Sequence, residues 1–200
     1  MGADLDPEDL AEELRKLVEP LGEFDRISVG FPGVVVEGVT KTAPNLHATW
    51  AGFDLARALA EGWRKPCRVL NDAGVQGLGV IAGTGVEMLL TLGTGLGCGL
   101  YLDGKYVPNL ELGHHPCGNG KTYEEYLGGK ALDKVGKKKW NKRVREMIEQ
   151  ILPIWNPRRL YLGGGNAKHV KGDLPPDVEI VSNIAGLLGG IALWNDAKSK

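Results

Sequence analysis

The dipeptide Asn71-Asp72 is the place in the sequence where residue type and position most directly suggest chemistry. It ends the apolar stretch that begins at Cys67, which has the composition of a buried strand. A carboxylate at such a strand end can accept the proton of a substrate hydroxyl while the neighbouring amide holds a second hydroxyl, which is general-base chemistry. The same pair could instead cap the helix that follows, and the two roles are compatible.

Further groups that could bind hydroxyls lie in "NLELGHHPCGNGKTYEEY", which contains Glu111, His114 and Glu124. These side chains could hydrogen-bond several hydroxyls of a polyol. The alternative is that each is an ordinary surface residue, which is the usual role of a lone Glu or His.

Two glycine-rich stretches follow apolar runs: "TLGTGLGCGL" at residues 91–100 and Gly163-Gly164-Gly165. A glycine turn after a strand lets successive N–H groups point at one anion and allows a phosphate close to the backbone. The alternative for residues 91–100 is a tight β-hairpin. The stretch is not a P-loop, since no Lys-Ser or Lys-Thr follows, and it lacks the glycine spacing of the dinucleotide fingerprint.

For these candidate residues to act together, the strands that precede them must end at the same edge of a sheet. Apolar runs and turn residues predict strands within residues 25–33, 34–40, 66–74, 85–109, 158–165 and 177–182, and helices from Asp6, within 52–63, within 130–152 and within 184–194. The segment 85–109 reads as three strands joined by the glycine turn and an Asp-Gly turn. Strands interleaved with helices predict an α/β fold, with ligands at the carboxyl edge of a sheet.

Composition limits the broad class of the protein. The chain has 200 residues, a net charge of -1 and three cysteines, and no apolar run approaches the roughly 20 residues that span a bilayer. Nothing in the overall charge indicates a nucleic acid or membrane partner. The odd, widely spaced cysteines fit a reducing compartment, so we expect a cytoplasmic protein of one large domain or two lobes.

Four motifs occur in one order: "VLNDAG", "LTLGTGLG", "ELGHHPCGNGKTYEEYLGG" and "YLGGGNA". Together they resemble the sugar kinases of the ROK family, and most closely its polyphosphate-glucokinase-type branch, from about Ile27 to Trp194. The resemblance implies an actin-like (ribonuclease H-like) fold, in which sugar and phosphoryl donor meet between two α/β lobes. It places an N-terminal lobe at residues 1–83, a C-terminal lobe at 84–183, and a final helix at 184–200 that packs back toward the first lobe.

The resemblance also implies roles for individual residues. Asp72 resembles the base that takes the proton from the sugar 6-hydroxyl. Sugar contacts are implied for Asn45, Asn71, Asp72, Glu111, His114 and Glu124. Phosphate contacts are implied for Gly93, Thr94, Gly95, Gly97, Gly163, Gly164 and Gly165. The implied reaction moves a phosphoryl group from polyphosphate or ATP, with Mg²⁺, to the 6-hydroxyl of glucose or a related hexose.

The sequence departs from the family pattern in two places. Many members hold a structural zinc through a histidine and three cysteines, whereas this stretch contains Cys117 alone, so we predict no structural zinc. The Asp-x-Gly-Gly-Thr turn that opens the family fold does not occur, so we expect an N-terminal lobe shortened by about three strands, with an exposed sheet edge that favours a homodimer. The alternative to an active kinase is a non-catalytic sugar-binding remnant or regulator.

One basic segment, "VGKKKWNKRVR", has a pattern that suits an anionic partner. On a helix, Lys138, Lys142 and Arg145 would share a face and could follow a polyphosphate chain. The alternative is a solvated basic helix face.

Overall fold

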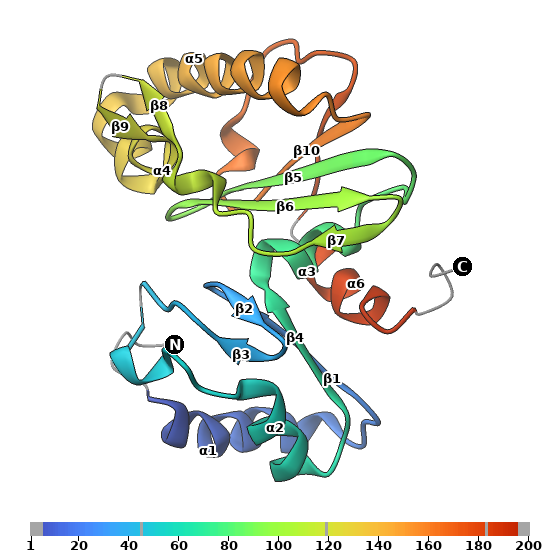
Figure 1. The fold of residues 1–200 in the computed structure, drawn as a ribbon. Helices are drawn as coiled ribbons and strands as arrows, with labels where there is room; N and C mark the ends of the chain where they lie inside the picture. The colour runs from blue at the N-terminus through green and yellow to red at the C-terminus, as the bar shows by residue number, and fades with distance from the viewer. Residues whose placement is uncertain (1–5, 45, 119, 183, 196–200) are drawn as a thin grey trace. The chain divides into compact units, whose positions relative to one another are not determined.

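The computed structural model describes residues 6–44, 46–118, 120–182 and 184–195 (Figure 1). The contacts within the chain divide it into two compact units, residues 1–72 and 73–200. The boundary predicted from the sequence, after residue 83, stays a prediction. Helix α3 (Asp72–Leu78) groups with the second unit from Ala73 onward.

The first unit is a small α/β layer built around a parallel strand pair. Strands β1 and β4 pair in parallel, with Ile27 opposite Cys67 and Phe31 opposite Asn71. The elements of this unit are α1 (Pro7–Val18), a 3-10 turn (Glu19–Leu21), β1 (Ile27–Phe31), β2 (Val35–Val36), β3 (Val39–Thr40), a 3-10 turn (Ala48–Trp50), α2 (Leu55–Trp63) and β4 (Cys67–Asn71).

Short-range capping explains where the two helices of this unit begin. The Asp6 carboxylate accepts a hydrogen bond from the Asp9 N–H at 3.0 Å, and the Asp54 carboxylate accepts one from the Arg57 N–H at 3.0 Å. Each bond satisfies an N–H group that has no partner inside its helix. The predicted start of α1 at Asp6-Pro7 is confirmed.

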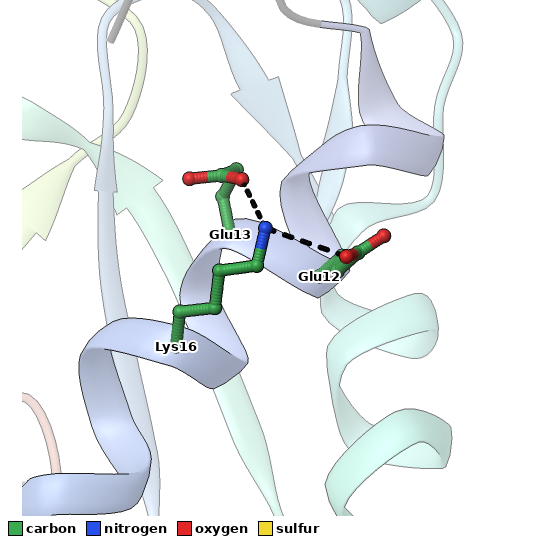
Figure 2. A network of polar contacts seen from close by, with 3 residues as sticks. All are labelled: Glu12, Glu13 and Lys16. Carbon is green, nitrogen blue, oxygen red and sulfur yellow. Dashed lines mark hydrogen bonds and ion pairs between the residues drawn. The ribbon is translucent and has the colours of Figure 1, made fainter.

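The outer face of α1 carries the charge network shown in Figure 2. The Lys16 ammonium lies 2.8 Å from the Glu13 carboxylate and 3.3 Å from that of Glu12. Hydrogen bonds to Glu13 and Glu12 and their negative charges raise the pKa of Lys16. All three side chains are exposed, so the network marks the solvent face of α1 and adds little to stability.

The single strand predicted for residues 34–40 is wrong, because the segment forms a hairpin of β2 and β3. The turn consists of Glu37 (φ 51°) and Gly38 (φ 82°), and Val36 faces Val39 across it. Two consecutive residues with positive φ reverse the chain as hairpin turns require.

A cavity of about 670 Å³ lies against β1 in this unit. Apolar side chains of α1, β1 and α2 line it, among them Leu14, Val29 and Leu59. Within the described residues, β1 pairs with β4 alone. The shortening of the N-terminal lobe by about three strands stays a prediction.

The second unit is a five-stranded mixed sheet with helices on both faces (Figure 1). The strand order is β11-β10-β5-β6-β7; β5, β10 and β11 are parallel, and β6 and β7 are antiparallel to their neighbours. Besides α3, the elements are β5 (Val86–Leu92), β6 (Leu96–Leu102), β7 (Lys105–Val107), a 3-10 turn (Leu112–His114), β8 (Pro116–Gly118), β9 (Lys121–Thr122), α4 (Tyr123–Leu127), α5 (Gly129–Trp155), β10 (Arg159–Gly163), a 3-10 turn (Ala167–His169), β11 (Val178–Ile180) and α6 (Ala185–Ala192).

Strand β5 lies at the centre of this sheet and is buried on both faces. Met88 and Leu90 belong to the large core that includes Trp140 and Ile148 of α5. Leu89 points to the opposite face and clusters with side chains near the end of α3. The alternation explains why the β5 sequence carries apolar residues for both faces, from Met88 to Leu90 and at Leu92.

Helix α5 changes direction once, at Gly136 (φ 74°, ψ 159°). Past this kink, the indole N–H of the buried Trp140 donates to the Leu127 carbonyl at 2.7 Å. Trp140 therefore ties the second segment of α5 to the end of α4.

Helix α6 packs on α3 through small residues. A Cβ on Gly189 would overlap with the Val75 carbonyl oxygen, and one on Gly79 would overlap with that of Ala185. The other side of α6 exposes Ile184, Leu187 and other apolar side chains. The prediction that this helix packs toward the N-terminal lobe stays a prediction.

In the described part of the chain, none of the helices has the combination of length and apolar character needed to cross a bilayer.

Candidate active site

The turn between β5 and β6 consists of Gly93, Thr94 and Gly95, because Leu92 and Leu96 form the last pair of the two strands. The Gly93 N–H donates to the Gly95 carbonyl at 3.1 Å. The hairpin reading of this stretch is therefore confirmed, and the tip carries the residues predicted to contact phosphate.

The glycine turn after β10 lies directly beside this hairpin. Gly164 has φ +83°, and a Cβ there would lie 2.5 Å from the Leu92 carbonyl oxygen. The Asn166 N–H donates to the same carbonyl at 2.8 Å, and the Asn166 side-chain amide donates to the Gly93 carbonyl at 3.0 Å. The structure thus brings the two predicted phosphate-binding segments together at one sheet edge.

The beginning of α5 forms a third side of this arrangement. The Gly129 N–H donates to the carbonyls of Gly93 (2.9 Å) and Thr94 (3.0 Å), and a Cβ on Gly128 would lie 2.6 Å from the Thr94 oxygen. The positive end of a helix dipole favours nearby negative charge. No individual role was predicted for Gly128, Gly129 and Asn166, although all three lie in the quoted motifs. The glycine pair between two helices and the Asn that ends "GGGN" are the signals that could have revealed them.

Glu124 lies against the tip of the hairpin. It is in the first turn of α4, which begins with a capping box in which Thr122 and Glu125 bond each other's backbone N–H. A Cβ on Gly95 would overlap with Glu124 Oε2. A predicted sugar-binding carboxylate therefore adjoins a predicted phosphate-binding turn.

Glu111 and His114 lie at the two ends of one 3-10 turn, with Glu111 Oε2 4.0 Å from His114 Nε2. Both side chains are exposed to solvent. A Cβ on Gly113 would lie 2.5 Å from the Leu96 carbonyl oxygen, so this turn packs directly on the start of β6. Below it, burial and the Glu111 charge raise the pKa of the Cys98 thiol to about 12, which keeps that thiol protonated and unreactive.

Asn71 and Asp72 differ in their environment. Asn71 is buried, and its amide donates to the Gly33 carbonyl at 3.2 Å. Asp72 is exposed and is the first residue of α3, directly after the end of β4. The roles of base and helix cap stay predictions. Ala73, the next residue, packs on β6, because a Cβ on Gly97 would lie 3.1 Å from Ala73 Cβ.

The remaining predicted residues have varied surroundings. Asn45 lies outside the described residues. Lys138 is exposed, Lys142 lies 3.7 Å from the Glu146 carboxylate, and Arg145 donates to the Lys171 carbonyl at 3.1 Å.

In the stretch for which we predict no structural zinc, the side chains of His115 and Cys117 contact backbone groups. His115 Nδ1 donates to the Pro116 carbonyl at 2.9 Å, and Cys117 Sγ donates to the Thr122 carbonyl at 3.4 Å. Across the residues that the structure describes, no group of three His, Cys, Asp or Glu side chains is placed to hold a metal ion. The absence of a structural zinc stays a prediction.

The α/β sheet, the paired glycine turns and the adjoining carboxylate form one candidate site, and comparison with known proteins shows the family. The chain belongs to the ROK family, whose model matches residues 4–156. Its fold is the actin-like fold of ROK sugar kinases.

Among curated proteins, the chain is similar to polyphosphate glucokinases of Mycobacterium. It is 32% identical over 197 residues to that of Mycobacterium tuberculosis, with 90% of this chain and 74% of that protein covered. It is 30% identical over 196 residues to that of Mycobacterium leprae, with 90% of this chain covered. The match spans 60% of the length of the Mycobacterium leprae protein.

Among solved structures, the chain is similar to the inorganic polyphosphate/ATP-glucomannokinase of Arthrobacter sp. strain KM. The TM-score is 0.81 at 28% identity, with 94% of this chain and 82% of that one covered. A ROK family glucokinase from Streptomyces griseus shares the fold with a TM-score of 0.73 at 18% identity, with 94% of this chain and 88% of that one covered. These matches support the prediction of a kinase.

Proposed function

We propose that this chain transfers a phosphoryl group from polyphosphate or ATP to the 6-hydroxyl of glucose. The observation that carries the proposal is the contact between the Glu124 carboxylate and Gly95. It joins a side chain suited to sugar hydroxyls to a turn suited to phosphate, and phosphoryl transfer depends on holding acceptor and donor next to each other. The names of the Mycobacterium and Arthrobacter relatives agree with both substrates.

The proposed division of labour follows from the chemistry of the groups. Glu111, His114 and Glu124 hydrogen-bond the sugar hydroxyls, and the turns that contain Gly93 and Gly164 hold the donor through backbone N–H groups. Asp72 accepts the proton of the sugar 6-hydroxyl while the oxygen of that hydroxyl forms a bond to the transferred phosphorus. The bond from that phosphorus to the donor's bridging oxygen breaks, and the departing phosphate keeps the electron pair.

Asn71 has a supporting role in this proposal. Its buried amide is bonded to the Gly33 carbonyl, so it fixes the end of β4 immediately before Asp72. A direct sugar contact by Asn71 stays a prediction, as does that of Asn45.

Mg²⁺ is expected to accompany the donor. This ion is usually held by one or two carboxylates, waters and substrate phosphates, and it would neutralise phosphate charge. The described residues contain no three-ligand cluster, which fits an ion held mainly by the donor. In this proposal the exposed Asp72 carboxylate contacts the water shell of the ion.

The test is product formation with two sugars and two donors. Glucose and 6-deoxyglucose are each incubated with Mg²⁺ and either ATP or polyphosphate, and sugar phosphate is followed by ³¹P NMR. We expect glucose 6-phosphate from glucose and no sugar phosphate from 6-deoxyglucose. Calorimetric glucose binding without product from either donor would contradict the proposal and support the non-catalytic sugar-binding alternative.

A further inference from the structure

A second basic segment lies beside α5, formed by the 3-10 turn Ala167–His169 and the residues that follow it. Asn141 of α5 holds this segment: its amide nitrogen donates to the His169 carbonyl at 2.9 Å, and its oxygen accepts from the Lys171 N–H at 2.6 Å. The same nitrogen donates to the Lys137 carbonyl at 2.9 Å. One buried amide therefore fixes two basic stretches, distant in sequence, against each other.

Arg145, one helical turn beyond Asn141, adds a second link through its bond to the Lys171 carbonyl at 3.1 Å. Its guanidinium also lies 3.1 Å from the position of a Cβ on Gly172. Arg145 is thus committed to holding the segment in place. Lys142 differs, since it lies 3.7 Å from the Glu146 carboxylate on the same helix.

Three lysines converge where these stretches meet: Lys137, Lys168 and Lys171. Partial burial, and then the positive charges of these three lysines, lower the pKa of the His169 imidazole between them. All three lysines are exposed, and in the described part of the chain none of them forms an ion pair. Like charges gathered without counter-charges repel one another, and an anion on this surface would relieve the repulsion.

This surface continues directly from the glycine turn after β10. Asn166, whose side chain donates to the Gly93 carbonyl, is followed in the chain by Ala167 and Lys168. A linear anion held at the turn could therefore extend along the lysines.

We propose that Lys137, Lys168 and Lys171 bind the distal phosphates of a polyphosphate chain whose terminal phosphate lies at the glycine turns. This inference rests on the proposed function and extends it to the choice of donor. Arg145 and Asn141 position this surface. ATP ends in a nucleoside after three phosphates, so the lysines favour long-chain polyphosphate over ATP.

The kinetic test compares two double variants of equal charge change. Lys137→Gln with Lys171→Gln removes two lysines of the surface; Lys65→Gln with Lys105→Gln removes two exposed lysines from the loop before β4 and from β7. We expect the first variant to raise KM for long-chain polyphosphate about tenfold, with KM for ATP changed less than about twofold. The control should change neither.

The outcomes separate this inference from the proposed function. Normal ATP-dependent activity with unchanged KM for long-chain polyphosphate in the first variant would overturn the lysine surface alone. Absence of sugar phosphate with every donor would overturn the proposed function.

In that second case, binding is read without catalysis by following the His169 ring in NMR titrations. Polyphosphate should raise the pKa of His169 in the unmodified chain, because the negative charge of polyphosphate offsets the positive charge of the lysines. No change on adding polyphosphate would overturn the surface.

Discussion

At the scale of single residues, Gly95 is the position where the sugar and phosphate sides of the proposed site touch. Any side chain there must displace the Glu124 carboxylate, because even a Cβ would overlap with Glu124 Oε2. The glycine is therefore required by its neighbour as well as by the turn.

Replacing Gly95 by alanine should raise KM for glucose about tenfold or more, with a smaller effect on stability. The reason is that a displaced Glu124 loses its proposed hydrogen bonds to the sugar. Steady-state kinetics and thermal unfolding of Gly95→Ala provide the measurement. Gly62→Ala is the matched control, because a Cβ on that α2 glycine meets no atom within 4 Å. Equal KM values for Gly95→Ala and the unmodified chain would refute the proposed role of Glu124.

Glu87 shows how a buried carboxylate can be stabilising. Its carboxylate accepts hydrogen bonds from the Ala82, Gly83 and Thr84 N–H groups at 2.8, 2.7 and 3.1 Å and from the Tyr161 hydroxyl at 2.9 Å. Burial acts to raise the pKa of Glu87, but these four donors together lower it below its ordinary value. The bond to Glu87, after burial, also raises the pKa of Tyr161 to about 12.

A depressed pKa in the folded state means that Glu87 stabilises the fold above its ordinary pKa of 4.5, and that this contribution is lost as the pH falls through the lowered value. Glu87→Gln should therefore reduce the free energy of unfolding by roughly 1–3 kcal/mol at pH 7. Urea unfolding from pH 7 to pH 3 should show that the difference in free energy of unfolding between Glu87→Gln and the unmodified chain shrinks on acidification. A constant difference across this range would rule out the charge as its cause.

At the scale of elements, the packing of α6 on α3 depends on glycine at one position and tolerates substitution at another. Gly189 faces the Val75 carbonyl, whereas a Cβ on Gly186, in the same helix, meets no atom within 4 Å. The two glycines are matched in residue type and helix and differ in their contacts.

Gly189→Ala should destabilise the second unit by about 1–3 kcal/mol, because the backbone of α3 cannot yield as a side chain would. Gly186→Ala should stabilise it by about 0.5–1 kcal/mol through helix propensity. Denaturant unfolding of both variants gives the comparison. Equal stability of the pair would show that α6 does not pack on α3 as described.

Most elements could be predicted from the sequence because each has a local cause. The start of α1 follows from a capping aspartate, and the β5-β6-β7 meander follows from apolar runs separated by turn residues. The β2-β3 hairpin was mistaken for one strand, although the Glu37-Gly38 pair is a recognisable hairpin turn. Turn chemistry should have outweighed the apolar run.

At the scale of the whole molecule, the sequence pointed to the segments of the proposed site but not to the contacts that join them. Asp72, Glu124 and the two glycine turns could be found because each belongs to a motif. The bonds that Gly129 and Asn166 make to carbonyls of the hairpin tip could not, since a contact between segments distant in the sequence leaves no local pattern. The same holds for Asn141.

Oligomeric state also belongs to this scale. A homodimer was expected from a sheet edge without a partner, and in the described residues β1 indeed pairs with β4 alone. The homodimer stays a prediction, to be checked by sedimentation or light scattering of the purified protein.

The most direct measurement of the proposed function is glucose 6-phosphate formation by the unmodified chain and by Asp72→Asn, with glucose binding followed in parallel by calorimetry. Asparagine keeps the size of the side chain but cannot accept the proton. We expect turnover by the unmodified chain to fall by about 10²–10⁴-fold in the variant, with glucose affinity retained within a few-fold. Turnover that is unchanged in Asp72→Asn, or absent from the unmodified chain, would contradict the assignment of Asp72 as the base of a sugar kinase.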